Sequence, residues 1–192
     1  MNFKAYDILS TLVPGFLLLL ALLRFLDLPF DKDLILPYTA FAFLLGYLVN
    51  TLSSWLEGII EFTWGGKPST QLLMGKSIWK VRFYESQKVI DLLRLESASN
   101  NPSPDELFSI AMRYGNEKDS RVGDLNASYA FSRSLLTCVV LAGVFLLIRN
   151  YDDWHYYMAI IPILIAVWLR CKQRGYYYAR EVLSNYLKIK TN

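Results

Sequence analysis

The chain has 192 residues, of which 54% are hydrophobic, 15% aromatic and 19% charged, and its formal net charge is +3. An ordinary globular domain is about 45–50% apolar and about 25% charged. The apolar excess lies in four runs that are nearly free of charge, residues 8–26, 34–56, 135–148 and 154–169, which argues against an ordinary soluble domain. Two cysteines without CxxC spacing and a single histidine indicate neither a disulfide framework nor a metal site, and we expect no cofactor.

Four apolar runs predict four membrane helices, because a span needs about 17–25 residues. The first two runs have this length, and the last two reach it if residues 129–134 and 170–171 are included. We therefore predict an all-α membrane protein in which two transmembrane hairpins enclose a small helical cytosolic insertion. Residues 1–63 would hold helices 1 and 2, residues 64–121 the insertion, residues 122–171 helices 3 and 4, and residues 172–192 an amphipathic tail helix. A soluble hairpin for the last two runs and a cleaved signal peptide for the first are the less favoured alternatives.

The first span contains Pro14 and Gly15 within STLVPGFLLLL. Proline removes a helical hydrogen bond, so a kink or a short break is expected there. A simple kink is the plainer interpretation. The functional interpretation makes Pro14 and Gly15 a hinge and a candidate gate.

The second span is expected to run without interruption to Thr63. Seven residues recur along it every three or four positions and therefore share one face, which is small or polar except at Phe43: Thr39, Phe43, Gly46, Asn50, Ser54, Glu57 and Glu61. Such a face either packs against other helices or lines an aqueous pathway. In the second case Asn50, Ser54, Glu57 and Glu61 would line a pore, and their acidic end would favour cations.

The insertion follows WGGKPST, a sequence that ends a helix. One amphipathic helix is predicted over residues 84–98. A second is marked by Ser103 as N-cap, Pro104 at the first helical position and Glu106 as the partner of a capping box, with Gly115 as its C-terminal stop. A unit this small needs support from the membrane helices or from other subunits.

The third span begins with Arg133 between two serines, level with the acidic end of the second span. We predict that Arg133 forms an ion pair with Glu57 or Glu61 and so ties the two hairpins together; contact with lipid headgroups is the alternative. Ser134, Cys138 and Ala142 form a small-residue seam suited to helix packing. In the tail, Tyr178, Val182, Tyr186 and Ile189 make an apolar stripe among basic residues. Arg174, Tyr178 and Arg180 are therefore candidates for contact with lipid, a partner subunit or a nucleotide.

Lysine and arginine counts orient the chain. With a cytosolic N-terminus, 17 of these residues face inward and Arg24, Lys32 and Arg149 face outward, which places both termini in the cytosol. The basic inner side suits anionic lipid, and it could also attract nucleic acid or nucleotide. Enzymatic activity is not expected: Gly75, Lys76 and Ser77 imitate the end of a phosphate-binding loop, but Thr70 stands where its first glycine belongs.

The segments YDILSTLVPGFLLLL, GYLVN and SRSLL resemble small four-helix bacterial membrane proteins found in anti-phage loci. The layout is similar to that of the membrane effector of Hailong-type defence, and less closely to the membrane subunit of Kiwa-type defence. The first resemblance implies an oligomeric ion channel of the inner membrane, expected to be a tetramer and controlled by oligonucleotides from a partner enzyme. The second implies a sensor of envelope disturbance that holds a cytosolic DNA-binding partner.

The leading hypothesis is therefore a homo-oligomeric inner-membrane pore that dissipates ion gradients when a cytosolic signal arrives. Its rival is a non-conducting membrane anchor or sensor that recruits a cytosolic partner protein. Four helices cannot enclose a useful channel alone, so the first hypothesis requires several subunits.

Overall fold

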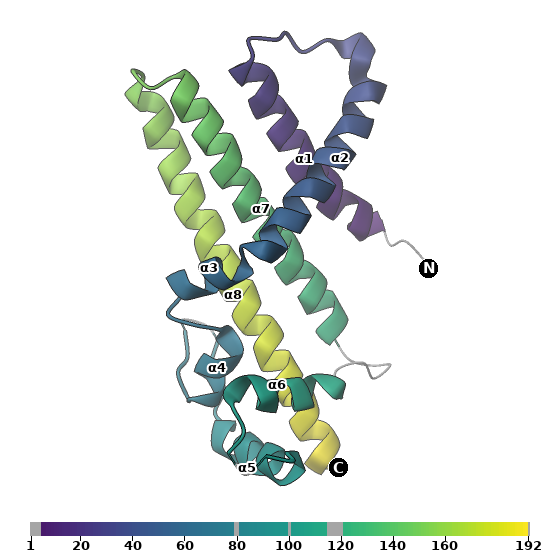
Figure 1. Ribbon diagram of the computed structural model, residues 1–192, viewed down its shortest axis with the longest axis vertical. Helices are drawn as coiled ribbons and strands as arrows, with labels where there is room; N and C mark the ends of the chain where they lie inside the picture. Colours follow the sequence, from purple (N-terminus) through teal and green to yellow (C-terminus); the bar gives the residue numbers. More distant parts are fainter. Residues whose placement is uncertain (1–4, 79–80, 100, 115–120, 192) are drawn as a thin grey trace. The chain divides into compact units, whose positions relative to one another are not determined.

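The computed structural model describes residues 5–78, 81–99, 101–114 and 121–191, and these residues form helices without a strand. The elements are α1 (Ala5–Phe25), η1 (Lys32–Leu34), α2 (Ile35–Trp55), α3 (Glu57–Thr63), α4 (Pro68–Leu73), α5 (Ser86–Glu96), α6 (Pro104–Arg113), α7 (Val122–Arg149) and α8 (Trp154–Thr191) (Figure 1). Gly115, the predicted stop of the second insertion helix, lies outside the described residues.

Three helical stretches among the described residues are long and apolar enough to cross a membrane: Lys32–Trp55, Val122–Arg149 and Trp154–Thr191. The apolar stretch of α1, Ser10–Phe25, is shorter. The chain is therefore an all-helical membrane protein with three stretches of spanning length.

The chain divides into two compact units. The first, here called the membrane unit, comprises Met1–Glu57 and Ala130–Cys171; the second, the insertion unit, comprises Gly58–Tyr129 and Lys172–Asn192. Both α7 and α8 contribute residues to each unit.

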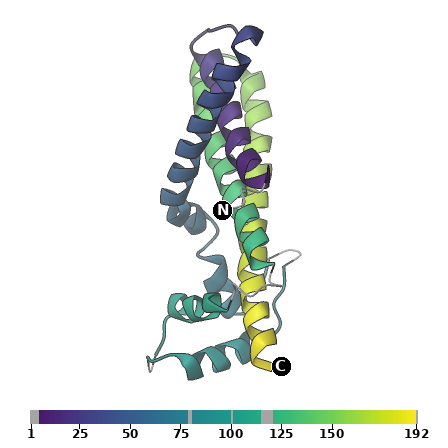
Figure 2. The same ribbon diagram turned by 90° about the vertical axis from the view of Figure 1, so that its right-hand side faces the viewer.

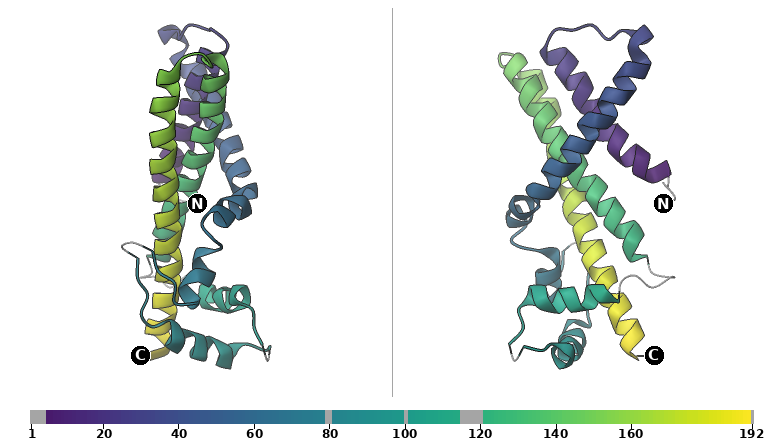
Figure 3. Two further views of the ribbon diagram at one scale, coloured as in Figure 1. Left: turned by 90° about the vertical axis from the view of Figure 1, so that its left-hand side faces the viewer. Right: turned by 45° about the vertical axis from the view of Figure 1, so that its right-hand side comes forward.

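In the membrane unit, α1 and α2 cross, as Figures 1 and 3 show, and Gly15 and Gly46 lie where their backbones touch. A Cβ at Gly15 would overlap the Ala42 carbonyl oxygen, and a Cβ at Gly46 would overlap the Thr11 carbonyl oxygen. The two backbones therefore touch, which only glycine permits.

Pro14 lies beside this crossing and is fully buried. The thiol of Cys138, on α7, donates a hydrogen bond of 3.0 Å to the Pro14 carbonyl oxygen. α1 continues through Pro14 as a single helix, so the short break considered for this position does not occur.

α2 ends at Trp55, whereas the sequence predicted one helix to Thr63; Leu56 separates it from α3. The hydroxyl of Thr51 donates to the Tyr47 carbonyl oxygen, and that of Ser53 donates to the Asn50 carbonyl oxygen. Such side-chain bonds to the preceding turn compete with the backbone pattern and bend helices. Gly58, just beyond, also has low helix propensity. Together these features account for the interruption.

The insertion unit has a hydrophobic core of its own, to which α4, α5, α6, the start of α7 and the end of α8 contribute. Figure 2 shows the course of these helices. The predicted start of α6 is confirmed: Ser103 is the N-cap, its hydroxyl accepts a hydrogen bond from the Glu106 amide, and Pro104 follows. The Glu106 carboxylate accepts a bond from the Ser97 hydroxyl, which joins α6 to the end of α5.

The tail is the last part of α8 rather than a separate helix. Its predicted apolar stripe does not face lipid, because Val182 and Tyr186 are fully buried in the core of the insertion unit. A small insertion gains core volume when the tail packs against it, which the expectation of a membrane-surface tail overlooked.

The carboxylate of Glu96 fastens this tail to α5. It accepts hydrogen bonds from the Tyr114 hydroxyl at 2.9 Å and the Tyr186 hydroxyl at 3.0 Å, and it pairs with the Lys190 ammonium at 2.6 Å. Desolvation raises the pKa of Glu96, but these bonds outweigh it, so the pKa lies below its ordinary value. Burial, followed by the bond to Glu96, raises the pKa of Tyr186.

We predict that Gly46→Ala lowers the free energy of unfolding by about 1–3 kcal/mol or more, because the new methyl group overlaps backbone that cannot move aside alone. Gly123→Ala is the control, since a Cβ there meets no atom within 4 Å. Thermal unfolding of the purified chain in detergent, followed by size exclusion, measures the difference. Equal midpoints for the two variants would show that the helices do not touch at Gly46.

Candidate polar site between α2 and α7

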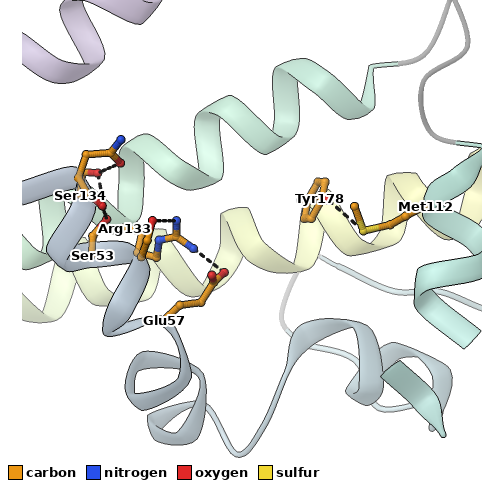
Figure 4. A network of polar contacts seen from close by, with 8 residues as sticks. Ser53, Glu57, Met112, Arg133, Ser134 and Tyr178 are labelled. Carbon is orange, nitrogen blue, oxygen red and sulfur yellow. Dashed lines mark hydrogen bonds and ion pairs between the residues drawn. The ribbon is translucent and has the colours of Figure 1, made fainter. Parts of the chain in front are cut away.

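Six polar residues meet where α2 approaches α7, and we call them the α2–α7 cluster: Asn50, Ser53, Ser54, Glu57, Arg133 and Ser134 (Figure 4). All six belong to the membrane unit. The first three lie in the last two turns of α2, and Glu57 is the first residue of α3.

Arg133 is the centre of the charged half of the cluster. Its Nη1 lies 2.5 Å from the Glu57 Oε1, and its Nη2 donates a hydrogen bond of 3.1 Å to the Ser54 hydroxyl. The Arg133 side chain is 10% exposed, whereas that of Glu57 is 37% exposed. A buried cation in an apolar helix is stable only with such partners.

Ser134 is the centre of the neutral half. Its hydroxyl donates a hydrogen bond of 2.9 Å to the Asn50 Oδ1 and lies 3.2 Å from the Ser53 hydroxyl. Ser53 is fully buried. These bonds cross between helices whose sequences are about 80 positions apart, so they join the first part of the membrane unit to the second.

The structure thus brings three of the predicted pore-lining residues, Asn50, Ser54 and Glu57, to Arg133 and its neighbour Ser134. Glu61 lies further along, in α3, and belongs to the insertion unit. Pro14 and Gly15, the predicted gate, lie in the crossing of α1 and α2 described above.

The predicted polar face of α2 is not its buried face. The buried residues are Ala42, Gly46, Val49 and Ser53, which share only Gly46 with the predicted face. Their spacing of four, three and four residues, with small side chains at three of the four positions, is the pattern of a tightly packed helix seam. This pattern was present in the sequence and could have identified Ser53, which our prediction missed.

Asn50 and Ser54 remain exposed on the surface of α2 although both bond to α7. Their exposed neighbours along the helix are large and apolar, among them Tyr47, Leu48 and Trp55. The cluster therefore has a bonded side toward α7 and an open side on α2.

The predicted ligand-contact residues lie in the part of α8 that belongs to the insertion unit. The Tyr178 hydroxyl contacts the Met112 Sδ at 3.5 Å (Figure 4), and its ring stacks on that of Tyr129 with centroids 6.2 Å apart. The Arg180 guanidinium lies 5.2 Å from the centroid of the Tyr177 ring. Tyr178 is thus engaged in contacts within the unit, while Arg174, also in α8, is half-buried.

Arg180 also lines a polar hollow of about 540 Å³ together with Arg82, Tyr84, Glu85 and Glu181. Two cations and two anions face it, so its charges balance. Among the residues that the structure describes, no group of histidine, cysteine and acidic side chains could hold a metal ion.

Comparisons with known proteins give no further guide to this arrangement. No protein family matches the chain, and no curated protein and no solved structure is similar to it.

We predict that Arg133→Gln lowers the free energy of unfolding by about 1–3 kcal/mol, less than for a fully buried pair because Glu57 is partly exposed. Glu57→Gln should cost a similar amount by stranding Arg133, and the double variant should cost less than the sum of the two. Unfolding midpoints in detergent provide the measurement. Arg149→Gln is the control. Arg149 is the last residue of α7, and this substitution removes its exposed ion pair with Asp27, which follows α1. If the double variant lost as much unfolding free energy as the two single variants together, the ion pair between Arg133 and Glu57 would be refuted.

Proposed function

We propose that the protein spans the bacterial inner membrane four times, as two hairpins, with both termini and the insertion unit in the cytosol. Packing supports α1 as the fourth span: it touches α2 at Gly46, near the middle of a helix of spanning length, so it must lie at the same depth. The lopsided distribution of lysine and arginine supports the orientation.

This topology is tested by placing a protease site between Ser97 and Asn101, in the connection between α5 and α6. We expect cleavage in inverted membrane vesicles, which expose the cytosolic face, and protection in intact spheroplasts. A second site between Leu28 and Asp31, before η1, is the matched control and should show the opposite pattern. Cleavage of the first site in intact spheroplasts would refute the orientation.

On this topology the membrane unit acts as a homo-oligomeric ion pore. The observation that carries the proposal is the open side of the α2–α7 cluster. Asn50 lies five residues before Trp55, or about 7 Å along the helix axis. If Trp55 lies at the interface, Asn50 is therefore deeper in the bilayer than Trp55. A polar side chain exposed at that depth is costly in lipid, and it favours contact with water or with another subunit.

The position of the cluster in the chain supports control by a cytosolic signal. Glu57 is the last residue of the membrane unit before the insertion, and Arg133 follows shortly after the chain re-enters it at Ala130. The ion pair thus joins the two points of the membrane unit between which the insertion is placed in the sequence. A ligand such as a nucleotide or a partner protein could act by altering this ion pair. An effector of anti-phage defence, the role implied by the resemblance, would use such a response to dissipate the membrane potential.

Single-channel recording of the purified chain in planar bilayers tests the pore, because rare openings are detected even if the signal is absent. We expect discrete cation-selective events. Asn50→Leu should reduce their conductance severalfold, and Glu57→Gln should weaken cation selectivity. Thr39→Val is the matched control, since its hydroxyl bonds to the preceding turn of α2 at the other end of the helix from the cluster. Unaltered conductance and selectivity in the first two variants would remove the cluster from the pore.

A second candidate function is a non-conducting anchor or envelope sensor that recruits a cytosolic partner. It is favoured by the bonds of Asn50 and Ser54 to α7, which satisfy these groups within one chain. It predicts no channel events in the wild-type chain, together with the same loss of stability on substitution of Arg133. The recording therefore separates the two candidates.

A further inference from the structure

Helix α3 carries large apolar side chains that the described structure leaves uncovered. Ile59 is 64% exposed and Phe62 is 83% exposed. Trp55, the last residue of α2, is 76% exposed and immediately precedes this segment.

The exposed residues define one face of α3. Ile59 and Phe62 are three positions apart and so lie together on a helix, while Glu57 and Glu61, four apart, lie on the opposite side. α3 is therefore amphipathic over its short length. With seven residues and two carboxylates it is too short and too polar to enter the hydrocarbon core as a span.

We propose that α3 lies in the membrane–water interface and that Ile59 and Phe62 insert into bilayer lipid. Continuity with the membrane supports lipid as the occupant: only Leu56 separates α3 from α2, a helix of spanning length. The chain thus enters the interface at Trp55, and an amphipathic segment there lies parallel to the surface with its apolar side in the acyl region.

The charges of α3 agree with this placement. A carboxylate close to anionic lipid is unfavourable unless it is compensated. Glu57 is paired with Arg133, so one of the two acidic residues of α3 carries its own counter-charge. The break between α2 and α3 then has a physical role, since it lets the chain turn from a spanning direction to an interfacial one.

Labelling experiments with full-length protein test the proposal. Phe62→Cys and Tyr84→Cys are matched, because the native side chains are 83% and 82% exposed and both belong to the insertion unit. Cys138 and Cys171 are fully buried, so an environment-sensitive NBD label will react with the introduced thiol under native conditions. The labelled chains are reconstituted in phosphatidylcholine–phosphatidylglycerol vesicles with and without lipids that carry a shallow nitroxide quencher.

We expect a blue-shifted label at position 62 that the nitroxide lipid quenches at least about twofold more strongly than the label at position 84. Ile59→Cys repeats the measurement at an independent position, in case the first variant does not fold. Equal quenching at positions 62 and 84 would overturn the proposal. So would a label at 62 that is shielded from nitroxide lipid while unlabelled Phe62→Cys forms a disulfide-linked dimer, because a second copy would then cover this face.

Discussion

The arrangement of the membrane unit depends on the need to compensate one permanent charge. Arg133 lies at the start of the long apolar stretch of α7 and cannot lose its proton, so its burial requires polar or charged partners. Glu57 and Ser54 supply them, and both come from the end of the first helical pair. A buried pair of this kind contributes little net stability compared with apolar packing, but it penalises every arrangement that separates the partners. Its value therefore lies in selecting one register between α2 and α7.

Two other contacts hold α1 against α2 and α7. The glycine crossing brings the backbones of α1 and α2 together, and the Cys138 thiol reaches from α7 to the carbonyl beside that crossing. Neither contact relies on the hydrophobic effect, which does not drive helices together within lipid. Close backbone approach and interhelical hydrogen bonds do so instead. The buried seam on α2 is consistent with this rule, since it consists mostly of small residues.

The insertion unit follows the ordinary rules of a soluble domain. Its core needs the end of α8, which the sequence separates from the insertion by two membrane helices. A substitution in the tail would thus reach the core of the insertion unit. If α3 also lies on the bilayer surface, the unit is attached to the membrane at its first helix as well as through α7 and α8.

The sequence by itself determined the features that depend on local composition. Long runs without charge predicted helices of spanning length, and Ser103 with Pro104 predicted the start of α6, because these signals act within a few residues. Tertiary structure decided which face of α2 is buried, where α2 ends and where the tail packs. Asn50 and Ser53 both bond to Ser134 on α7, yet Ser53 is buried and Asn50 is exposed, a difference set by how α2 packs against its neighbours. The stripe of Val182 and Tyr186 suits lipid and a protein core equally well, so its partner could be known only from the assembled insertion unit.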